Sequence, residues 1–551
     1  MFGVKNIFIY FLAFRNNIII FLKKIYFKSE YYNSKIIEKT ENKFLFFPNP
    51  YLLSSLTNKN NFEFSLNANT VYKIWDQTNA TSKSHYPHNF LWLSLIDRKN
   101  DGAIVRKVIS DWVDKYKKYE KEIWKPSLTS LRIISWIMNA ELILSSKNIT
   151  FGNEFVKVLF TQINHLKESH LNENEPSKQI EILSAIILSG IVFKDREDNF
   201  NLGFSKLEKL LVEFFDVNGF PHNKNPYHIL KFLKFLILIK ECLKESNNNT
   251  PEYVDKIIEK FLKNISYLIT PSKQLPLFNG TSEINLDSFL EYLKNLNYRT
   301  KEEKELSIDI KKIRFKKDVI FLDTSSTPKK KFSGFYQSGP LSFEYFFDKN
   351  KIITNGGFGS SISKKAALIS RLSSSQSSIT INDYSATRLE RNNLINRTFG
   401  YLIKDPIKIF DVSLEEDNVK LDLSASHDAY KKRLGLKVSR LIRINKISND
   451  IQGEDTLTKS NALPSDLNFT IRFHLYPGVG ATKTMSGRSA LIQLNKNKSL
   501  LFHSDNCSLD IEKGIFFGKN KIINNLNIFL KGKITKEKEV ICWGIKKNID
   551  A

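Results

Sequence analysis

Cysteine and glycine are both scarce in this chain of 551 residues. The three cysteines, Cys242, Cys507 and Cys542, show neither C-x-x-C spacing nor a Cys/His cluster, so they predict no disulfide framework and no zinc site. The 22 glycines amount to about 4% against an average of ~7%, which excludes collagen-like and glycine-rich low-complexity proteins. The cysteines are therefore expected to be structural thiols.

Long apolar runs are also lacking, since no stretch reaches the ~18 residues of a transmembrane helix. The N-terminal residues 1–40 contain two shorter apolar runs, Ile7–Phe14 and Ile18–Leu22. A signal peptide needs a basic start and a small-x-small cleavage site, whereas only Lys5 precedes these runs and no such site follows them. We therefore expect a helix that lies on a membrane or packs against the body of the protein.

Motifs for nucleotide binding and serine hydrolysis are missing. Gly356-Gly357-Phe358-Gly359 follows a predicted strand, but it opens no helix and lacks the Lys-Ser/Thr of a Walker loop. The serine-rich stretches have no G-x-S-x-G setting. These absences argue against an NTPase, a dinucleotide-dependent enzyme or a serine hydrolase.

Basic residues outnumber acidic ones by 83 to 58, which gives a formal net charge of +25. This charge suits a polyanionic partner such as nucleic acid, an anionic membrane or an acidic polysaccharide. A bias toward AT-rich codons accounts for the charge equally well, because lysine, isoleucine and asparagine are all abundant. The basic residues are dispersed and no nucleic-acid module is visible, so we expect no nucleic-acid partner.

The hydrophobic pattern changes its period near residue 305. From about Gly102 to Leu296, apolar residues recur at helical spacing, which predicts stacked antiparallel helix pairs. Afterwards, short runs rich in β-branched and aromatic residues alternate with turn residues, which predicts a large β-sandwich. We expect a lead segment at 1–40, a helical domain at 41–305 and a β-sandwich domain at 306–551.

A tryptophan and an arginine mark the first candidate for ligand binding. Trp124 lies before a proline in a predicted loop, and the helical pattern that follows contains Arg132. An indole can stack on a sugar ring, and an arginine can hold a carboxylate through two hydrogen bonds. A structural tryptophan with a solvated arginine is the alternative.

The segment from Trp124 to Trp136, W-x-P followed by S-L-R and a second tryptophan, resembles the bacterial heparinase II/III family of polysaccharide lyases. Later segments resemble this family in the same order: D-V-N-G-F-P-H-N-K-N-P at 216–226, L-P-L-F-N-G at 275–280, G-P-L-S-F-E at 339–344, I-T-N-G-G at 353–357, S-H-D-A-Y at 426–430 and F-H-L-Y-P-G-V at 473–479. The resemblance runs from about residue 90 to 545 and is strongest to an alphaproteobacterial branch. It implies an α+β multidomain fold, an incomplete (α/α) toroid of helix pairs followed by an antiparallel β-sandwich.

The resemblance also implies β-elimination on an acidic, uronic-acid polysaccharide such as a glycosaminoglycan or alginate. A donor must neutralise the uronate carboxylate, a base must remove the C5 proton and an acid must protonate the leaving oxygen. This carbon–oxygen lyase reaction requires no metal and no cofactor, so we expect neither.

The sequence departs from the family at both signature histidines. The histidine of the toroid's Asn-His pair falls on Lys178, and that of the sandwich motif falls on Gln376. The family's tyrosine in the toroid corresponds best to Tyr227, although the Pro226-Tyr227-His228 turn is one residue shorter than the family's P-M-Y-H turn. Because neither Lys178 nor Gln376 can act as an imidazole, we expect a tyrosine to be the base if the protein is a lyase.

The remaining candidates divide between the two halves. On the helical side we expect Tyr227 as base, with a helix cap as the alternative. On the sandwich side we expect Tyr430 as acid or alternate base, beside His427. Strand alternation would point these two side chains to opposite faces, so one of them is expected to be structural. The full set of predicted site residues is Tyr227, Tyr430, His427 and His222 for catalysis, and Trp124, Arg132, Asn225 and His228 for substrate binding.

Taken together, these features favour a lyase-like protein with a positively charged cleft between its halves, lined by Arg132, Trp124, Asn225 and Tyr227. The alternative is a catalytically degenerate or retargeted polysaccharide-binding protein of envelope or capsule metabolism. A periplasmic or envelope location is expected, with the cytoplasm as the alternative. The sugar, the linkage and the oligomeric state are left open.

Overall fold

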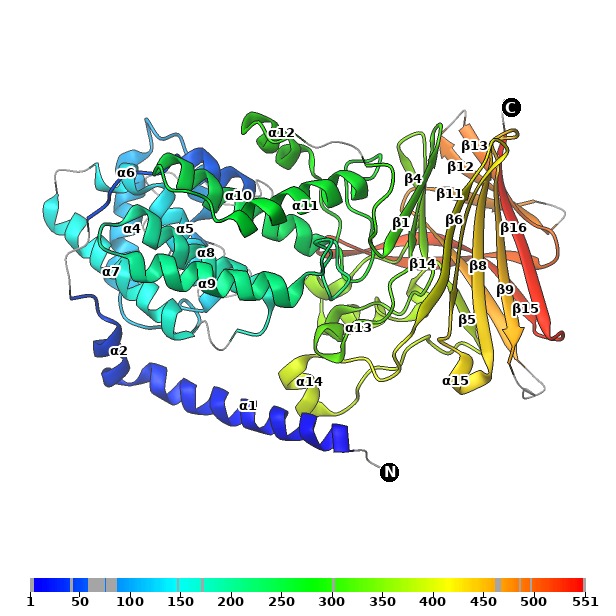
Figure 1. Cartoon of the computed structure of the whole chain (residues 1–551), viewed down its shortest axis with the longest axis horizontal. Helices are drawn as coiled ribbons and strands as arrows, with labels where there is room; N and C mark the ends of the chain where they lie inside the picture. The colour runs from blue at the N-terminus through cyan, green and yellow to red at the C-terminus, as the bar shows by residue number, and fades with distance from the viewer. Residues whose placement is uncertain are drawn as a thin grey trace.

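In the computed structural model of the chain, α-helices form the first part and β-strands the second (Figure 1). The structure describes residues 4–39, 43–57, 75, 87–145, 148–169, 173–299, 303–460, 467–484, 487–495 and 498–548. The predicted fold class is confirmed, because helices give way to two antiparallel sheets. Part of the boundary predicted near residue 305, residues 300–302, lies outside the described residues.

The longer helices each have an apolar face at regular spacing. In α11, the buried Val254, Ile258, Phe261 and Ile265 follow one another at three- and four-residue intervals. The helices of this half are α1 (Val4–Lys28), α2 (Glu30–Ile36), α4 (Gly102–Tyr116), α5 (Pro126–Met138), α6 (Ala140–Leu144), α7 (Ile149–Ser169), α8 (Pro176–Val192), α9 (Glu197–Phe214), α10 (Tyr227–Glu245), α11 (Glu252–Leu268) and α12 (Asp287–Asn295), with 3-10 turns η1 (Pro50–Leu56) and η5 (Leu91–Ser94).

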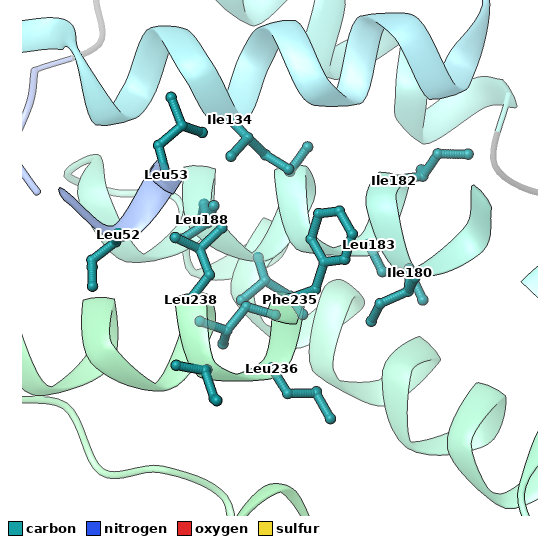
Figure 2. Close-up of a cluster of buried hydrophobic side chains, with 14 of the residues drawn as sticks. Leu52, Leu53, Ile134, Ile180, Ile182, Leu183, Leu188, Phe235, Leu236 and Leu238 are labelled. Carbon is teal, nitrogen blue, oxygen red and sulfur yellow. The ribbon is translucent and has the colours of Figure 1, made fainter. Parts of the chain in front are cut away.

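Helix α8 lies at the centre of the helical half. It packs against α5, α9 and α10, so nearly every residue in it is buried. Figure 2 shows its apolar side chains meeting those of η1, α5 and α10, namely Leu52, Leu53, Ile134, Ile180, Ile182, Leu183, Leu188, Phe235, Leu236 and Leu238. A helix that is apolar on most sides belongs in a core. The first turn of α8, with Pro176 and Gln179, lies beside the cavity described below.

Two eight-stranded sheets form the sandwich. One sheet runs in the order β1-β2-β3-β4-β10-β15-β14, with β5 paired to β10, and the other in the order β11-β12-β13-β16-β9-β8-β7-β6. The first comprises β1 (Ile310–Phe315), β2 (Asp318–Asp323), β3 (Phe343–Phe347), β4 (Asn350–Thr354), β5 (Ile379–Ile381), β10 (Asn468–Leu475), β14 (Ser508–Gly518) and β15 (Lys521–Lys533). The second comprises β6 (Ile409–Glu416), β7 (Lys420–His427), β8 (Leu436–Asn445), β9 (Ile451–Lys459), β11 (Gly480–Lys483), β12 (Ser489–Asn495), β13 (Lys498–Ser504) and β16 (Lys538–Asn548).

The first sheet lies between the helices and the second sheet. Along β2, Val319 and Phe321 belong to the helical core, whereas Ile320 and Leu322 belong to the core between the sheets. Successive side chains of a strand point to opposite faces, so a strand covered on both sides is apolar throughout. The two halves therefore share a continuous packed boundary.

Short helices leave the sandwich and approach this boundary. The 3-10 turn η7 (Lys330–Phe335) does so between β2 and β3, and helix α14 (Asn393–Phe399) does so between β5 and β6 (Figure 1). The other short helices are α13 (Lys364–Ile369), between β4 and β5, and α15 (Lys431–Leu434), between β7 and β8. η7 and the end of α14 form the sandwich side of the candidate site.

Candidate functional site

A cavity of about 620 Å³ opens between the helical half and the sandwich half. Its size falls within the range of small-molecule and saccharide sites. The helical side supplies Glu173, Asn174, Glu175, Pro176, Gln179, Leu210, Glu213, Phe214, Asn223 and His228, and the sandwich side supplies Lys331, Phe332, Gly334, Phe335, Thr398, Phe399 and Gly400.

The turn before α10 builds one wall of the cavity from two asparagine-centred turns. The Asn225 N–H donates to Asn223 Oδ1 at 3.1 Å, and the Tyr227 N–H donates to Asn225 Oδ1 at 3.0 Å. Lys224 between them has a left-handed φ of 64°, and Pro226 is the N-cap residue directly before α10. Asn225 itself is buried, and its Oδ1 also accepts from Thr281 Oγ1 at 2.9 Å.

His228 is buried at this wall and uncharged at neutral pH. Its ring lies edge-on to Phe214, with centroids 5.2 Å apart, and its Nδ1 lies 3.3 Å from Asn223 Nδ2. Burial, and after it the ammonium of Lys231, lowers the pKa of His228 to about 4. A neutral imidazole of this pKa is a poor base and carries no positive charge toward a carboxylate.

Carboxylates dominate the charge of the cavity lining. Glu173, Glu175 and Glu213 face it against one lining cation among the described residues, Lys331, which pairs with Glu213 at 2.6 Å. Burial raises the pKa of Glu175, but Lys178, 2.8 Å away, outweighs it, so the pKa lies below the usual value. The predicted positively charged cleft is therefore corrected by the structure. No group of three potential metal ligands occurs among the residues that the structure describes.

Aromatic rings form the sandwich wall. Phe332 and Phe335 lie on η7, and Phe335 is 43% exposed. His222 is half-buried and stacks on Phe332 with ring centroids 5.9 Å apart. Burial, and then the nearby Lys224, lowers the pKa of His222. His222 therefore lies beside the cavity, against one of its aromatic walls.

Tyr227 is half-buried at the first position of α10, next to His228. One helical turn on, Lys231 pairs with Glu181 at 2.6 Å. Burial lowers the pKa of Lys231, but the interactions with Glu181 and with the Tyr227 phenol outweigh it and raise the value. Lys231 is thus the cation close to Tyr227, whereas Lys224 pairs with Asp309 at 2.6 Å.

Trp124 and Arg132 lie inside the helical core, away from the cavity lining. The Arg132 guanidinium is fully buried and donates to Gln162 Oε1 at 2.6 Å, to Thr129 Oγ1 at 3.0 Å and to the carbonyls of His88 and Ile123. The Trp124 indole N–H donates to the Tyr116 carbonyl at 3.0 Å.

This placement corrects the expectation that the two residues line the cleft. The donors of Arg132 are already satisfied within the protein, and no surface of its guanidinium is open to a carboxylate.

His427 and Tyr430 are buried within the sandwich half. Strand β7 ends at His427, so the alternation expected for these residues does not extend to Tyr430, which lies in the turn before α15. The Tyr430 hydroxyl donates to the carbonyls of Ile379 and Tyr384, both at 3.1 Å. Burial raises the pKa of Tyr430, and burial, then Arg440, lowers that of His427 to about 3. Both residues are corrected from catalytic candidates to structural ones.

The two positions at which family histidines are replaced differ from one another. Lys178 is half-exposed near the cavity and bonded to Glu175, as given above. Gln376 is buried and its amide donates to the Ser370 carbonyl at 2.8 Å. Neither side chain takes over the function of an imidazole at the lining.

Sequence reasoning missed the acidic residues and the aromatic wall. Glu175 stands directly before Pro176, and Glu213 lies in the last turn of α9. A usable signal was present only for Lys231, which follows Tyr227 at the i+4 spacing of helix neighbours. The other lining residues gave no such signal, because their position in the site depends on which loops of the sandwich half reach the helices.

Comparisons with known proteins agree with this architecture. Residues 310–543 match the family described as Heparinase II/III-like, C-terminal. FtsZ-localized protein C of Caulobacter vibrioides is 23% identical over 463 residues, which cover 82% of this chain and 79% of that protein.

Solved structures share the fold of both halves. A heparan sulfate lyase HepC mutant from Pedobacter heparinus matches with a TM-score of 0.65 and 14% identity, over 91% of this chain and 87% of that one. The Streptomyces coelicolor A3 chondroitin AC lyase, in complex with chondroitin sulphate, matches with a TM-score of 0.50 and 7% identity, over 95% and 80%. The family match itself covers the sandwich half of the chain, residues 310–543, and the likeness of the helical half rests on the shared fold.

Proposed function

We propose that this chain binds a polysaccharide in the cavity between its halves and does not cleave it by β-elimination. The cavity combines exposed aromatic surface at Phe335 with the carboxylates of Glu173 and Glu175. Aromatic faces pack on sugar rings, and carboxylates accept hydrogen bonds from sugar hydroxyls and amides. This is the retargeted alternative that the sequence left open.

The charge of the lining is the observation that carries the proposal. β-Elimination needs a donor that neutralises the uronate carboxylate. The lining offers three carboxylates, and the cations Lys331 and Lys178 are already paired, with Glu213 and Glu175 respectively. His228 is neutral, and Arg132 is buried elsewhere. Like charges would repel a uronate at this site, so a saccharide with few carboxylates, such as an N-acetylated glycan, fits it better than a uronan.

The relatives support both parts of this proposal. The chondroitin AC lyase shows the same fold in complex with a polysaccharide. The Caulobacter relative is named for its localisation with FtsZ and not for a lyase activity. A location in the periplasm or at the envelope, with the cytoplasm as the alternative, stays a prediction.

The test compares binding and cleavage on the same panel: chitin oligosaccharides, heparan sulfate, chondroitin sulfate and alginate. Calorimetry is expected to show binding of the N-acetylated oligosaccharide, and ultraviolet absorbance is expected to show no unsaturated uronate from any uronan. Lyase activity on a uronan, or no binding of any saccharide, would overturn the proposal.

Two variants locate the binding. Glu175→Gln is expected to weaken it roughly tenfold or more, because a hydrogen bond to a charged group contributes about 1.5–3 kcal/mol. Phe335→Ala is expected to weaken it similarly. The matched control is Glu168→Gln, which removes a carboxylate paired with Lys35 at 2.8 Å outside the cavity and should leave affinity unchanged.

A lyase with Tyr227 as base is the second candidate function. The half-buried Tyr227 phenol beside the Lys231 ammonium favours it. If a uronan is cleaved, Tyr227→Phe is expected to lower the rate about 10²–10⁴-fold, the usual loss for a general base. Lys231→Gln would separate a charge effect from a loss of the phenol, since it keeps the hydroxyl in place.

A further inference from the structure

Helix α1 presents a stripe of large apolar side chains to solvent. The stripe consists of Phe11, Phe14, Ile18, Phe21, Leu22 and Ile25, each between 43% and 62% exposed. At 100° per residue these positions fall within about 100° of the helix circumference. They therefore form one continuous face and not a scatter of single exposed residues, which would need no explanation. Among the described side chains of α1, Ile20, 53% exposed, is the one exposed large apolar residue that lies outside this face.

The opposite face of α1 is attached to the body of the protein. Ala13 is buried, and the Asn17 amide donates to Thr398 Oγ1 of α14 at 2.8 Å. Toward the C-terminal end, the Phe27 ring packs against Tyr32 of α2 and His165 of α7. Figure 1 shows α1 running along the outside of the molecule, from α2 at the helical half to α14. These contacts hold α1 against the body of the protein and leave the apolar stripe facing solvent.

The charges beside the stripe all have one sign. Arg15, Lys24 and Lys28 are exposed, and the sequence Val4–Lys28 contains no acidic residue. Lysine and arginine can lay their aliphatic stems along an apolar surface while their charges reach outward. An apolar stripe bordered by cations is the pattern of a helix that lies in the plane of an anionic membrane.

We propose that α1 is an in-plane membrane anchor, with the stripe inserted at the boundary between headgroups and acyl chains of an anionic bilayer. No helix among the described residues is long and apolar enough to cross a membrane, so α1 lies on the surface. A second copy of this chain fits the stripe less well, because pairing two such faces would bring cations against cations. The side of α1 that faces the body contacts α14, and the end of α14 lines the cavity. In this arrangement the cavity lies next to the lipid surface.

Co-sedimentation of the full chain with unilamellar vesicles tests this anchor. We expect binding to vesicles of phosphatidylglycerol mixed with phosphatidylcholine, and much weaker binding to phosphatidylcholine alone. Arg15→Gln, Lys24→Gln and Lys28→Gln together are expected to lower the partition coefficient roughly a hundredfold, since each cation near an anionic surface contributes about 1 kcal/mol. Phe14→Glu with Phe21→Glu should abolish binding.

The control is Val217→Glu, which places the same charge at an apolar residue that is 82% exposed in the loop after α9. It should bind vesicles like the parent chain. Because the substituted stripe residues face solvent, thermal melting is expected to stay unchanged, which excludes misfolding as the cause. Vesicle binding that survives Phe14→Glu with Phe21→Glu overturns the proposal, and so does a parent chain that binds no anionic vesicle.

Two further measurements separate the other outcomes. All six tryptophans are buried, so Phe21→Trp adds an exposed indole whose fluorescence brominated lipids should quench. Absence of quenching would contradict insertion. Light scattering should show the same mass for the parent and for the stripe variant; a dimer that dissociates in the variant would assign the stripe to a second copy and overturn the membrane proposal.

Discussion

The helical half and the sandwich half use their polar side chains in different ways. In the sandwich, charged residues lie between strands as fully buried pairs, such as Arg440 with Asp455 at 2.7 Å and Lys351 with Glu344 at 3.2 Å. At the rim of the helical half, Glu175 and Asn223 face the cavity. The buried pairs hold the frame of the sandwich, whereas the polar side chains of the helical rim line the proposed saccharide site.

This difference shows how a fold shared with polysaccharide lyases can be kept while the lining of the cavity varies. His427 and Tyr430 belong to a motif shared in outline with the family, yet they are packed into the sandwich. The positions that depart, such as Lys178, lie near the cavity, where a substitution costs little packing. Breaking the frame and altering the rim should therefore have separable effects.

Acidification is expected to have the largest effect, and it acts on both halves. His165 and His228 in the helical half, and His427 and His474 in the sandwich, have pKa values lowered to between about 3 and about 4, chiefly by burial. The unfolded chain binds these protons near pH 6.5, so the free energy of unfolding is highest above pH 6.5 and falls as the pH drops toward 4.

Asp323 opposes this trend. Burial raises its pKa to about 6, so protonation favours the folded state as the pH falls through 6. Burial also raises the pKa values of Glu181, Glu245 and Asp318. The four histidine shifts together are larger, at ~1.4 kcal/mol per displaced pKa unit. Urea unfolding between pH 7.5 and about 4.5 should show a net loss of several kcal/mol, and an increase in stability over that range would contradict the burial of the histidines.

Removing one member of a buried pair is expected to have the next largest effect. Asp455→Ala leaves the Arg440 guanidinium buried without its carboxylate and also removes the acceptor of the Trp543 indole N–H. The loss should be about 3–5 kcal/mol in the free energy of unfolding by urea titration. Asp411→Ala, at an exposed pair with Lys437 in the same sheet, is the control and should change little. Equal losses would show that the frame is not held by its buried pairs.

Arg132→Met tests whether Arg132, predicted from the sequence to bind substrate, is a structural residue. The substitution removes the hydrogen bonds to Gln162 and Thr129 and the contact with the Trp112 ring. We expect a loss of about 2–4 kcal/mol in unfolding free energy, with saccharide affinity unchanged in the protein that remains folded. A stable variant that binds saccharide more weakly would restore Arg132 to the site.

Tyr430→Phe should give the smallest effect. It deletes a hydroxyl that donates to the Ile379 and Tyr384 carbonyls, at a cost of about 1–2 kcal/mol by denaturant titration. Saccharide affinity and any turnover should stay the same, because the hydroxyl does not reach the cavity lining. Lost activity at unchanged stability would return Tyr430 to catalysis.

Much of the fold could be predicted from the sequence because its two periods are strong. Alternation along β8 and the three- and four-residue spacing along α11 match their buried faces. The site was harder to predict because the sequence does not show whether Arg132 and Tyr430 bind a substrate or other groups of the same protein. The cavity depends on η7 and α14 meeting α8 across the boundary, and such contacts leave no periodic signal.

The most direct test of the central claim is a crystal structure of the full chain with a bound chitin oligosaccharide or a heparan sulfate oligosaccharide. We expect an intact oligosaccharide between α8 and η7, with a sugar ring against Phe335 and its polar groups near Glu175. A shortened product with an unsaturated uronate at its new end, or a saccharide bound away from this cavity, would contradict the account.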